Sequence, residues 1–489
     1  MERQVAKVAT GLLLALFSAC GPSWSERGGV DLEASGFTMH GSPFFPMVLN
    51  YEVSIRAVGD SIWVGAGVHY ASFDPSAIPD RESCRRQLRA DMTLIAELGF
   101  NTVRLVGFSH MEHARDSIWL NAWSKRGGDT LIHLVDKGAY ARYLSALDDM
   151  LAAVREAGLR AIMLTELRPD RPLTEDQFAR IADHFVNDTV ILAYDLFNEP
   201  LYFDRIERPK EEAFRILRHW RRVFDAHAPN QLYTLGLTGI RETFEFDPNM
   251  LGVDFISFHP YEYEPDQVRN ELRWYHNNVD VPWIIGETAI PADDDSVPYT
   301  AQFEFAQRTL LQGRACGALG YSWWQYQDVR WGKFHSDLMG VLNREGTTTT
   351  TKEQLQVNGT IKPVAKAFQQ FDPWTDAGEC VCLPNSLNYS EGRVCKITGR
   401  LVDVRGQPIN EGTVLGWNEH WTASYHTITG PDGRFELRGP EWLYHWMASA
   451  TRYSMDRGDS DPNGCRRGAD GIPAYELGDI VLERLTFVD

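Results

Sequence analysis

The stretch VILAYDLFNEP, residues 190–200, decides how the rest of the sequence is interpreted. Its first eight residues are apolar or aromatic apart from Asp195, and such a run is typical of a strand buried on both faces of a parallel sheet. The run then ends in Asn198 and Glu199. An amide and a carboxylate at the edge of a core cost free energy unless they are hydrogen-bonded. We therefore expect these two side chains to have a task at the end of this strand.

Seven further short apolar runs are similar to this one, and longer amphipathic segments separate them. Segments such as 84–99 and 139–158 repeat apolar residues at the spacing of a helix. Eight strands with interleaved helices over about 330 residues predict an α/β fold of the (β/α)8 or TIM-barrel type. The predicted strands cover residues 44–51, 100–108, 159–164, 190–197, 231–237, 253–260, 281–287 and 318–324.

Polar and aromatic side chains gather at one end of five of these strands. In a TIM barrel the chemistry takes place at the carboxyl ends of the strands, whereas core packing alone gives no reason for polar groups there. The residues are Arg104 in the second strand, Asn198 and Glu199 at the end of the fourth, His259 and Tyr261 at the end of the sixth, Glu287 at the end of the seventh, and Trp323 and Trp324 at the end of the eighth.

Two carboxylates at the mouth of a barrel can cleave an acetal. One must be protonated to assist the leaving group, and the other must be ionised; a separation of about 5 Å gives retention and about 6.5–9.5 Å gives inversion. Glu199 and Glu287 lie on strands nearly opposite each other, so their side chains can approach closely. An apolar setting and a second carboxylate nearby would raise the pKa of Glu199. Arg104 beside Glu287 would keep that carboxylate ionised.

Each of these residues also has a simpler explanation. A glutamate at a strand end is often a solvated loop residue, Arg104 is consistent with an interior charge satisfied by backbone groups, and either tryptophan is consistent with core packing. His110 and His113 lie close together in HMEH (110–113), but no third ligand is evident, so we expect no metal site there. The occurrence of polar and aromatic residues at the ends of all five strands is much harder to explain by chance than any one of these residues.

Four motifs resemble those of clan A glycoside hydrolases, most closely family 5, which contains cellulases and β-mannanases. They are YDLFNEP (194–200), ISFHPY (256–261), IIGET (284–288) and GYSWW (320–324). The resemblance covers most of residues 37–371. It implies a retaining double displacement in which Glu199 is the acid/base and Glu287 the nucleophile.

The same resemblance implies binding or positioning roles for five further residues. Asn198 would hold the sugar 2-hydroxyl, Arg104 and Tyr261 would position the nucleophile, His259 would lie near the acid/base, and Trp324 would form the platform under the reacting sugar.

The end of the third strand departs from the family pattern. Many family 5 cellulases have a histidine there, whereas this chain has Thr165 and Glu166. The departure argues against a cellulase and leaves mannanase-like or divergent members open.

The composition changes near residue 375, where β-type alternation and Gly, Pro and Asp turns begin. The segments ITGRLVDVRGQPI (397–409) and TGPDGRFEL (429–437) resemble the carboxypeptidase regulatory-like domain, a small β-sandwich. Such domains usually serve as spacers or interaction modules, so we expect no catalysis from this one. The sequence thus predicts a signal segment at 1–20, a catalytic barrel at 30–374 and a β-sandwich at 380–489.

The overall composition fits this two-domain organisation. The chain has 489 residues, of which 43% are hydrophobic and 12% aromatic, as in globular proteins. Its formal net charge of −19 at pH 7 excludes a nucleic-acid-binding protein, because a phosphate backbone requires a basic face. The charge says little about a neutral substrate such as a carbohydrate. No motif requires a cofactor, so we expect none.

The first residues, MERQVAKVATGLLLALFSACG (1–21), are typical of an export signal. Basic residues precede an apolar run over 12–17, which is too short to span a bilayer as a stable helix. The small residues before Cys20 resemble the lipobox of bacterial lipoproteins, although Phe17 stands where the pattern usually has Leu. The resemblance implies lipidation of Cys20 and a periplasmic or cell-surface location on the outer membrane. An ordinary secretory signal with an incidental cysteine is the alternative.

Export permits disulfides, and six cysteines remain after Cys20. The four at positions 380, 382, 395 and 465 suggest one or two bridges in a small C-terminal domain, with a connectivity that the sequence does not reveal. Cys84 and Cys316 lie in helical patterns, so we expect them to be buried free thiols.

The sequence therefore predicts a retaining glycoside hydrolase that cleaves β-linked polysaccharides of the β-mannan or β-glucan type, with endo action. Two alternatives remain open. One is an exo-acting β-glycosidase on oligosaccharides. The other is a non-catalytic glycan-binding lipoprotein, which predicts the loss of one carboxylate, whereas both are present.

The endo prediction depends on two long βα loops. Loop 109–137 carries Trp119 and Trp123, and loop 325–360 carries Trp331 and Phe334. Loops of this length are uncommon unless functional. Because indole faces stack on pyranose rings, we expect an aromatic-lined cleft that holds several sugars.

Overall fold

A computed structural model describes residues 29–486, except for 75–79, 110, 115–116, 125–127, 134–136, 167–171, 204–207, 263–264, 352–353, 377, 382–395, 440 and 468–470. The predicted lipidation at Cys20 therefore lies outside the described residues, and so do His110 and the side chain of His113. Among the described residues, no helix combines the length and apolar character needed to cross a membrane.

Eight parallel strands form a closed barrel, as the sequence predicts. The first barrel strand, β4, pairs in parallel with β6 on one side and with β15 on the other, and the second pairing closes the sheet. In order around the barrel the strands are β4 (Met47–Val58), β6 (Thr102–Val106), β10 (Arg160–Leu164), β11 (Ile191–Asn198), β12 (Leu232–Leu237), β13 (Phe255–Phe258), β14 (Trp283–Ile285) and β15 (Tyr321–Trp323).

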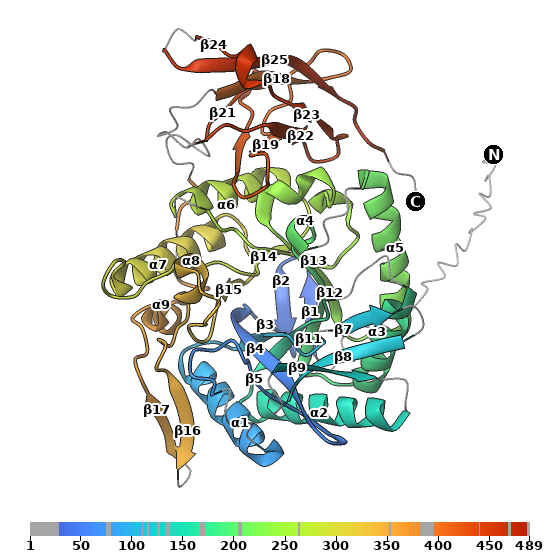
Figure 1. Ribbon diagram of the computed structural model, residues 1–489, viewed down its shortest axis with the longest axis vertical. Coiled ribbons are helices and arrows are strands. Elements are labelled where there is room, and N and C mark those ends of the chain that lie inside the picture. Colours follow the sequence, from blue (N-terminus) through green and yellow to red (C-terminus); the bar gives the residue numbers. More distant parts are fainter. Residues whose placement is uncertain are drawn as a thin grey trace, which may run out of the picture.

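Helices connect most of the barrel strands and cover the outside of the barrel (Figure 1). They are α1 (Arg81–Glu97), α2 (Lys137–Glu156), α3 (Pro172–Phe185), α5 (Lys210–His227), α6 (Gln267–Asn278), α7 (Tyr299–Ala315) and α9 (Ala365–Gln370). One connection differs. Between β12 and β13 the chain forms two short 3-10 helices, η2 (Gly239–Phe244) and η3 (Pro248–Met250), in place of a long α-helix.

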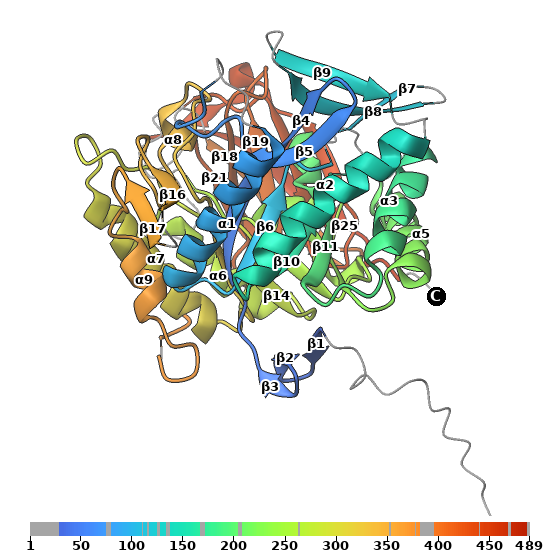
Figure 2. The same cartoon turned by 90° about the horizontal axis from the view of Figure 1, so that it is seen from below.

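A small antiparallel sheet closes the amino-terminal end of the barrel. It consists of β1 (Val30–Glu33), β2 (Gly36–Met39) and β3 (Ser42–Pro43). Phe37 of this sheet meets Phe255 of β13 edge to face, with ring centroids 5.2 Å apart. Figure 2 shows the sheet at the opposite end of the barrel from β7 and β9. The barrel is therefore open only where the strands end.

The two segments predicted as long loops contain regular structure. The first forms an antiparallel sheet of β7 (Met111–Ala114), β8 (Ser117–Ser124) and β9 (Gly128–His133), which is joined to β4. β4 itself continues into a hairpin with β5 (Ser61–Ala66). The second contains α8 (Phe334–Asp337) and a hairpin of β16 (Thr347–Thr351) and β17 (Gln354–Asn358). The β7–β9 sheet lies at the end of the barrel opposite β1–β3 (Figure 2), and α8 lines the cavity there. The β16–β17 hairpin instead packs against α1 on the outside of the barrel, where the Gln87 amide donates to the Thr348 hydroxyl at 2.7 Å.

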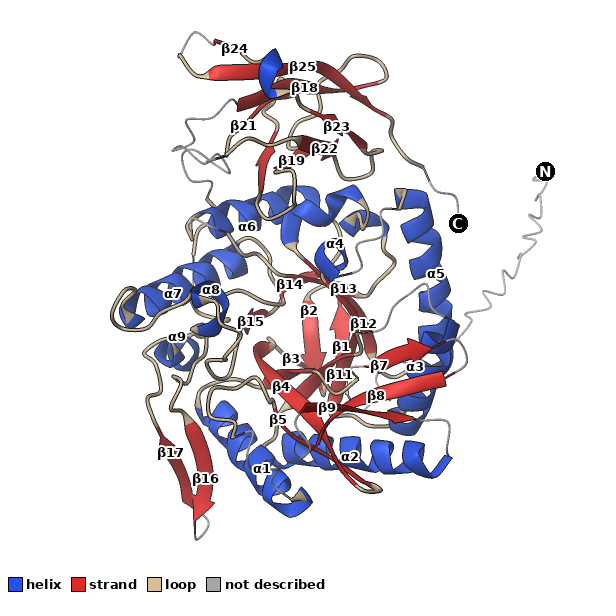
Figure 3. Ribbon diagram, viewed as in Figure 1, coloured by secondary structure: helices blue, strands red, loops and turns tan. Residues whose placement is uncertain are grey.

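The C-terminal part is a sandwich of two four-stranded sheets, which confirms the predicted fold class (Figure 3). Its interior is formed by apolar residues such as Leu401, Val414 and Leu437. One sheet contains β21 (Arg434–Leu437), β18 (Lys396–Asp403), β25 (Pro473–Leu482) and β24 (Arg466–Arg467), and the other β20 (Ser424–Ile428), β19 (Thr413–Trp417), β22 (His445–Ser449) and β23 (Asp456–Asp459).

The sandwich packs on the barrel at the segment that lacks a long helix. Phe244 of η2 lies in an apolar cluster with Leu415 of β19 and Met447 of β22. Beside this cluster the buried Lys210 ammonium donates to the Asp247 carboxylate and to the carbonyl oxygen of Ala450, both at 2.9 Å. An interface with a buried ion pair and an apolar cluster is a fixed one rather than a flexible tether.

The cysteine prediction is wrong for Cys316, which forms a disulfide with Cys380. The sequence grouped Cys380 with the sandwich because of its position, but the chain around it still runs along the barrel, where the Gln312 amide donates to the carbonyl oxygen of Val381 at 2.8 Å. Cys84 is a buried thiol outside any disulfide, as predicted. Cys465 in the sandwich is disulfide-bonded as well.

Candidate active site

The polar end of β11 turns sharply into the barrel mouth. Asn198 is the last residue of the strand, and Glu199 follows in the left-handed region with φ of 47°. The backbone N–H of Glu199 donates to the carbonyl oxygen of Gly236 at 3.0 Å, and Pro200 starts the short helix α4 (Pro200–Phe203). A residue other than glycine in this conformation costs about 1 kcal/mol or more and is typical of functional sites.

Arg104 of β6 connects the polar groups at the mouth and is only 1% exposed. Its Nε donates to Asp195 Oδ2 at 2.8 Å, and its Nη2 donates to Asn198 Oδ1 at 2.8 Å. Its Nη1 donates to Asn50 Oδ1 at 3.0 Å and to Glu287 Oε1. The guanidinium therefore fixes the Glu287 carboxylate and neutralises part of its charge.

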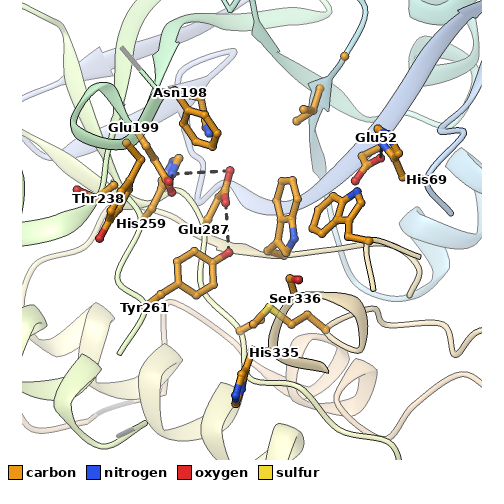
Figure 4. A pocket seen from close by; sticks show the side chains of 18 of the residues that line it. Glu52, His69, Asn198, Glu199, Thr238, His259, Tyr261, Glu287, His335 and Ser336 are labelled. Carbon is orange, nitrogen blue, oxygen red and sulfur yellow. Dashed lines mark hydrogen bonds and ion pairs between the residues drawn. The ribbon is translucent and has the colours of Figure 1, made fainter. Parts of the chain in front are cut away.

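The two glutamates meet across the pocket with His259 between them, as Figure 4 shows. His259 Nδ1 lies 2.9 Å from Glu199 Oε1 and 3.7 Å from Glu287 Oε1. One carboxylate oxygen of each glutamate and the imidazole nitrogen all lie within 4.8 Å of one another. The Tyr261 hydroxyl donates to Glu287 Oε2 at 3.2 Å. This arrangement holds Glu287 from two sides and leaves Glu199 bonded to an imidazole.

Burial raises the pKa of both glutamates, and different neighbours oppose the rise. Removal from water raises the pKa of Glu199 to about 7, against the opposing effect of Arg241 and Arg104. Burial also raises the pKa of Glu287, while the contacts with His259 and Arg104 oppose the rise. Burial lowers the pKa of His259 to about 4, so its imidazole is neutral near pH 7. The site thus holds one carboxyl that can carry a proton near neutrality beside one held by a guanidinium.

A cavity of about 1040 Å³ lies over this pair. The indoles of Trp324 and Trp331 form a wall of this cavity and stack with ring centroids 6.2 Å apart. Trp331 is 40% exposed. Next to Trp331, the His69 ring meets the indole edge to face with ring centroids 6.0 Å apart, and His69 pairs with Glu52 at 3.1 Å. The cavity therefore combines an aromatic wall with polar groups that can bond hydroxyls, which is the composition of a sugar-binding pocket.

All seven barrel residues predicted from the sequence come together here. Asn198, Glu199, His259, Tyr261, Glu287 and Trp324 line the cavity, and Arg104 lies directly behind it. Trp323, by contrast, is fully buried, and its indole N–H donates to the carbonyl oxygen of Met339 at 2.9 Å. Trp323 is therefore a core residue.

Three further residues of the site escaped the sequence analysis. Asp195 and Asn50 accept hydrogen bonds from Arg104. Each is the polar residue within one of the apolar runs recognised in the sequence, 190–197 and 44–51, a pattern that could have identified them. Arg241 lies in η2, and its Nη1 and Nη2 donate to the Tyr202 hydroxyl and to the carbonyl oxygen of Tyr261 at 3.0 and 2.9 Å. No sequence pattern marks Arg241, because its position depends on the unusual connection after β12.

The predicted aromatic loops are only partly described. Trp331 lines the cavity as expected. The side chains of Trp119, Trp123 and Phe334 lie outside the described residues. Glu166, the departure at the end of the third strand, lines the cavity with φ of 47°.

The same cluster has the residue types of a metal site but is bonded differently. Glu199, His259 and Glu287 each offer one possible ligand atom. However, His259 and Glu199 are hydrogen-bonded to each other, and Glu287 accepts from Arg104 and Tyr261. A cation would have to displace these bonds and approach a guanidinium, so these contacts favour the acid/base arrangement.

No protein-family model and no curated protein matches the chain. Among solved structures, it is similar to Bacteroides uniformis β-glucuronidase 2 covalently bound to an aziridine (12% identity, 91% of this chain and 47% of that chain, TM-score 0.45). It is also similar to an exo-β-1,4-mannosidase from an Opitutaceae bacterium (19%, 70% and 61%, TM-score 0.47) and to GH5_18 from Streptomyces cattleya in complex with GlcNAc (16%, 74% and 85%, TM-score 0.45). The chain spans about half the length of the β-glucuronidase. At these TM-scores the similarities carry no weight for activity.

Proposed function

We propose that this protein is a glycoside hydrolase that cleaves β-glycosidic bonds with retention of configuration. The observation that carries the proposal is the pair Glu199 and Glu287, whose nearest carboxylate oxygens lie within 4.8 Å at the mouth of a closed barrel. Retaining glycosidases have a separation of about 5–5.5 Å, whereas inverting enzymes need about 6.5–9.5 Å to admit a water molecule. The short distance favours direct attack by a carboxylate.

In the first step, a carboxylate oxygen of Glu287 attacks the anomeric carbon. The bond from that carbon to the glycosidic oxygen breaks, and Glu199 gives its proton to the departing oxygen. A pKa of about 7 keeps Glu199 largely protonated below neutrality. Arg104 and Tyr261 hold the Glu287 carboxylate in position for the attack.

In the second step, the glycosyl–enzyme ester is hydrolysed. Glu199, now ionised, removes a proton from water as the water oxygen attacks the anomeric carbon, and the bond to Glu287 breaks. Two inversions give net retention, and both carboxyl groups return to their starting states. His259 is neutral, so it leaves the proton on Glu199 between turnovers.

A panel of aryl β-glycosides and β-linked polysaccharides tests this proposal. We expect hydrolysis of at least one member, with the first-formed sugar in the β configuration by NMR. An α-configured first product would contradict retention. Saturable binding of a glycan without any hydrolysis would support the alternative of a non-catalytic glycan-binding protein.

We further propose endo action on a polymer of the β-mannan or β-glucan type. The volume of about 1040 Å³ lies just above the range of about 300–1,000 Å³ that is typical of small-molecule pockets. The stacked Trp324 and Trp331 offer a platform for more than one ring. Sizing of early products separates the possibilities, since endo action gives a ladder of oligosaccharides and an exo-glycosidase gives monosaccharide alone.

We also propose lipidation of Cys20 as the means of attachment to a bacterial outer membrane. The support is the lipobox-like segment at residues 17–20. A single Cys20→Ser substitution should move the protein from the membrane fraction to the soluble fraction. Unchanged fractionation would contradict the proposal.

A further inference from the structure

A second cluster of two glutamates and a histidine lies where the sandwich meets the barrel. Glu262 follows β13, Glu271 belongs to α6, and His426 belongs to β20 of the sandwich. Their side chains are 1%, 0% and 1% exposed. The proposed glycosidase reaction uses none of the three. Both domains therefore contribute to this buried polar cluster.

Glu262, Glu271 and His426 are called the interface cluster below. The distances from the histidine to the two glutamates are too long for hydrogen bonds. His426 Nε2 lies 3.7 Å from Glu262 Oε1 and 3.8 Å from Glu271 Oε1, and all three atoms lie within 4.8 Å of one another. Good N–H···O bonds measure about 2.7–3.2 Å. The Glu271 carboxyl is hydrogen-bonded to the Glu262 carboxyl, whereas the imidazole nitrogen faces both acids beyond hydrogen-bond distance.

Two of these atoms have no hydrogen-bond partner within the described residues, His426 Nε2 and Glu271 Oε1. The other oxygen of Glu271 is satisfied, since Tyr275 donates its hydroxyl to Oε2 at 2.5 Å. Leaving a buried polar atom without a partner costs about 1–3 kcal/mol. Because the two atoms lie only 3.8 Å apart, one occupant that bonds to both would remove both costs.

The ligand set identifies the chemical class of that occupant. The imidazole nitrogen of His426 and one oxygen of each glutamate can each offer a lone pair to a cation. Carboxylate oxygens and imidazole nitrogens bind Zn²⁺ at about 2.0–2.2 Å, which places tetrahedral ligands about 3.4 Å apart. The two separations from His426, 3.7 and 3.8 Å, need to shrink by only a few tenths of an ångström. Ca²⁺ prefers six to eight oxygen ligands and fits this set poorly.

We propose that Glu262, Glu271 and His426 bind a divalent transition-metal ion, with Zn²⁺ the preferred occupant, and that this ion joins the sandwich to the barrel. Three protein ligands leave a fourth position for water. Glu262 also lines the cavity of the active site, which gives the ion a route from solvent. Binding of the ion requires both domains in their docked positions, so it stabilises the docked state.

One neighbouring charge limits the affinity. Arg241 Nη2 lies 3.6 Å from Glu262 Oε1. The guanidinium is held by Tyr202 and Tyr261, so it does not move away freely. A fixed positive charge weakens cation binding. We therefore expect weaker zinc binding than in structural sites without a nearby arginine.

Metal analysis of the full chain tests this proposal. The protein is stripped with a chelator, incubated with Zn²⁺, desalted and analysed by plasma mass spectrometry. We expect wild type to retain about one zinc per chain more than His426→Ala. The exposed His420 on the same domain supplies the matched control, since His420→Ala should retain as much zinc as wild type.

A second variant and a second readout keep the test decisive if His426→Ala folds poorly. Glu271→Gln preserves size and should also lose the retained zinc. Zn²⁺ should raise the melting temperature of wild type and leave that of Glu271→Gln unchanged, whereas Ca²⁺ should change neither. Equal zinc in wild type and Glu271→Gln, or no retained zinc in wild type, would overturn the proposal. Neither readout depends on glycosidase activity, and Glu287→Gln should retain zinc.

Discussion

Two buried clusters in this molecule have the same residue types and opposite internal bonding. In the mouth cluster, Glu199 and His259 are 2.9 Å apart and Arg104 donates to Glu287. In the interface cluster, His426 lies 3.7 and 3.8 Å from its two glutamates. The first is closed by hydrogen bonds and opens on a large cavity, while the second lies between the domains, reaches that cavity through Glu262, and keeps its histidine beyond hydrogen-bond distance of both acids. Composition alone therefore does not assign a role.

Electrostatics does not separate the clusters either. Burial lowers the pKa of both His259 and His426 to about 4. Burial also raises the pKa of Glu199 at the mouth and of Glu271 at the interface. Perturbed pKa values indicate functional sites only when a cleft and suitable partners accompany them. The mouth cluster differs in that both of its glutamates line the cavity and Arg104 donates directly to one of them, whereas only Glu262 of the interface cluster lines the cavity.

The largest expected difference between the clusters is in turnover. Glu287→Gln should lower kcat by about 10⁴-fold or more, because the nucleophile is lost. Glu271→Gln in the interface cluster should lower kcat by less than about tenfold, because that residue touches no reacting atom. Steady-state kinetics on the best aryl glycoside measures both. Comparable losses from the two substitutions would break the distinction.

The second prediction concerns the stability of the domain interface. Lys210→Ala leaves Asp247 buried without its cation, which typically costs about 3–5 kcal/mol. Urea unfolding should show this loss, and the exposed Lys366 gives the control, since Lys366→Ala should change stability by less than about 0.5 kcal/mol. A loss below about 1 kcal/mol for Lys210→Ala would mean that the ion pair does not secure the sandwich.

The third prediction uses the raised pKa of Glu199. In the unfolded chain this carboxyl ionises near its usual value of 4.5, and in the folded protein near 7. The contribution of Glu199 to the free energy of unfolding is therefore fully present below the unfolded pKa, and it is lost as the pH rises through the folded pKa. Glu199→Gln removes this loss, so relative to wild type it should gain about 3 kcal/mol of stability between about pH 4 and pH 8. Urea unfolding at both pH values measures the gain; a constant difference would contradict a buried, protonated Glu199.

The smallest effect is expected at the aromatic wall of the cavity. Trp331→Ala should lower kcat/KM on a polysaccharide by about 3- to 10-fold, since aromatic stacking contributes about 0.5–1.5 kcal/mol. It should leave an aryl monoglycoside nearly unaffected. Trp374, which is 54% exposed and absent from the cavity lining, supplies the control substitution Trp374→Ala. Equal losses on both substrates would place Trp331 outside any extended binding site.

The sequence predicted the barrel because each strand is a continuous apolar run and needs no distant information to be recognised. It also predicted where Asn198, Glu199 and Glu287 would meet, since strand ends share one rim in this fold. It missed Arg241, whose position depends on η2 replacing a helix. It also missed the disulfide between Cys316 and Cys380 and the interface cluster, because these contacts join segments that no local pattern connects.

The assignment of Glu287 as nucleophile is tested most directly by trapping the covalent intermediate. A 2-deoxy-2-fluoro-β-glycoside with a good leaving group slows the second step, and its sugar is chosen from those that the protein hydrolyses. Peptide mass spectrometry should then find one fluorosugar per chain, attached to Glu287. Attachment to Glu199 or to any other carboxylate, or α-configured first products without an adduct, would contradict the proposed mechanism.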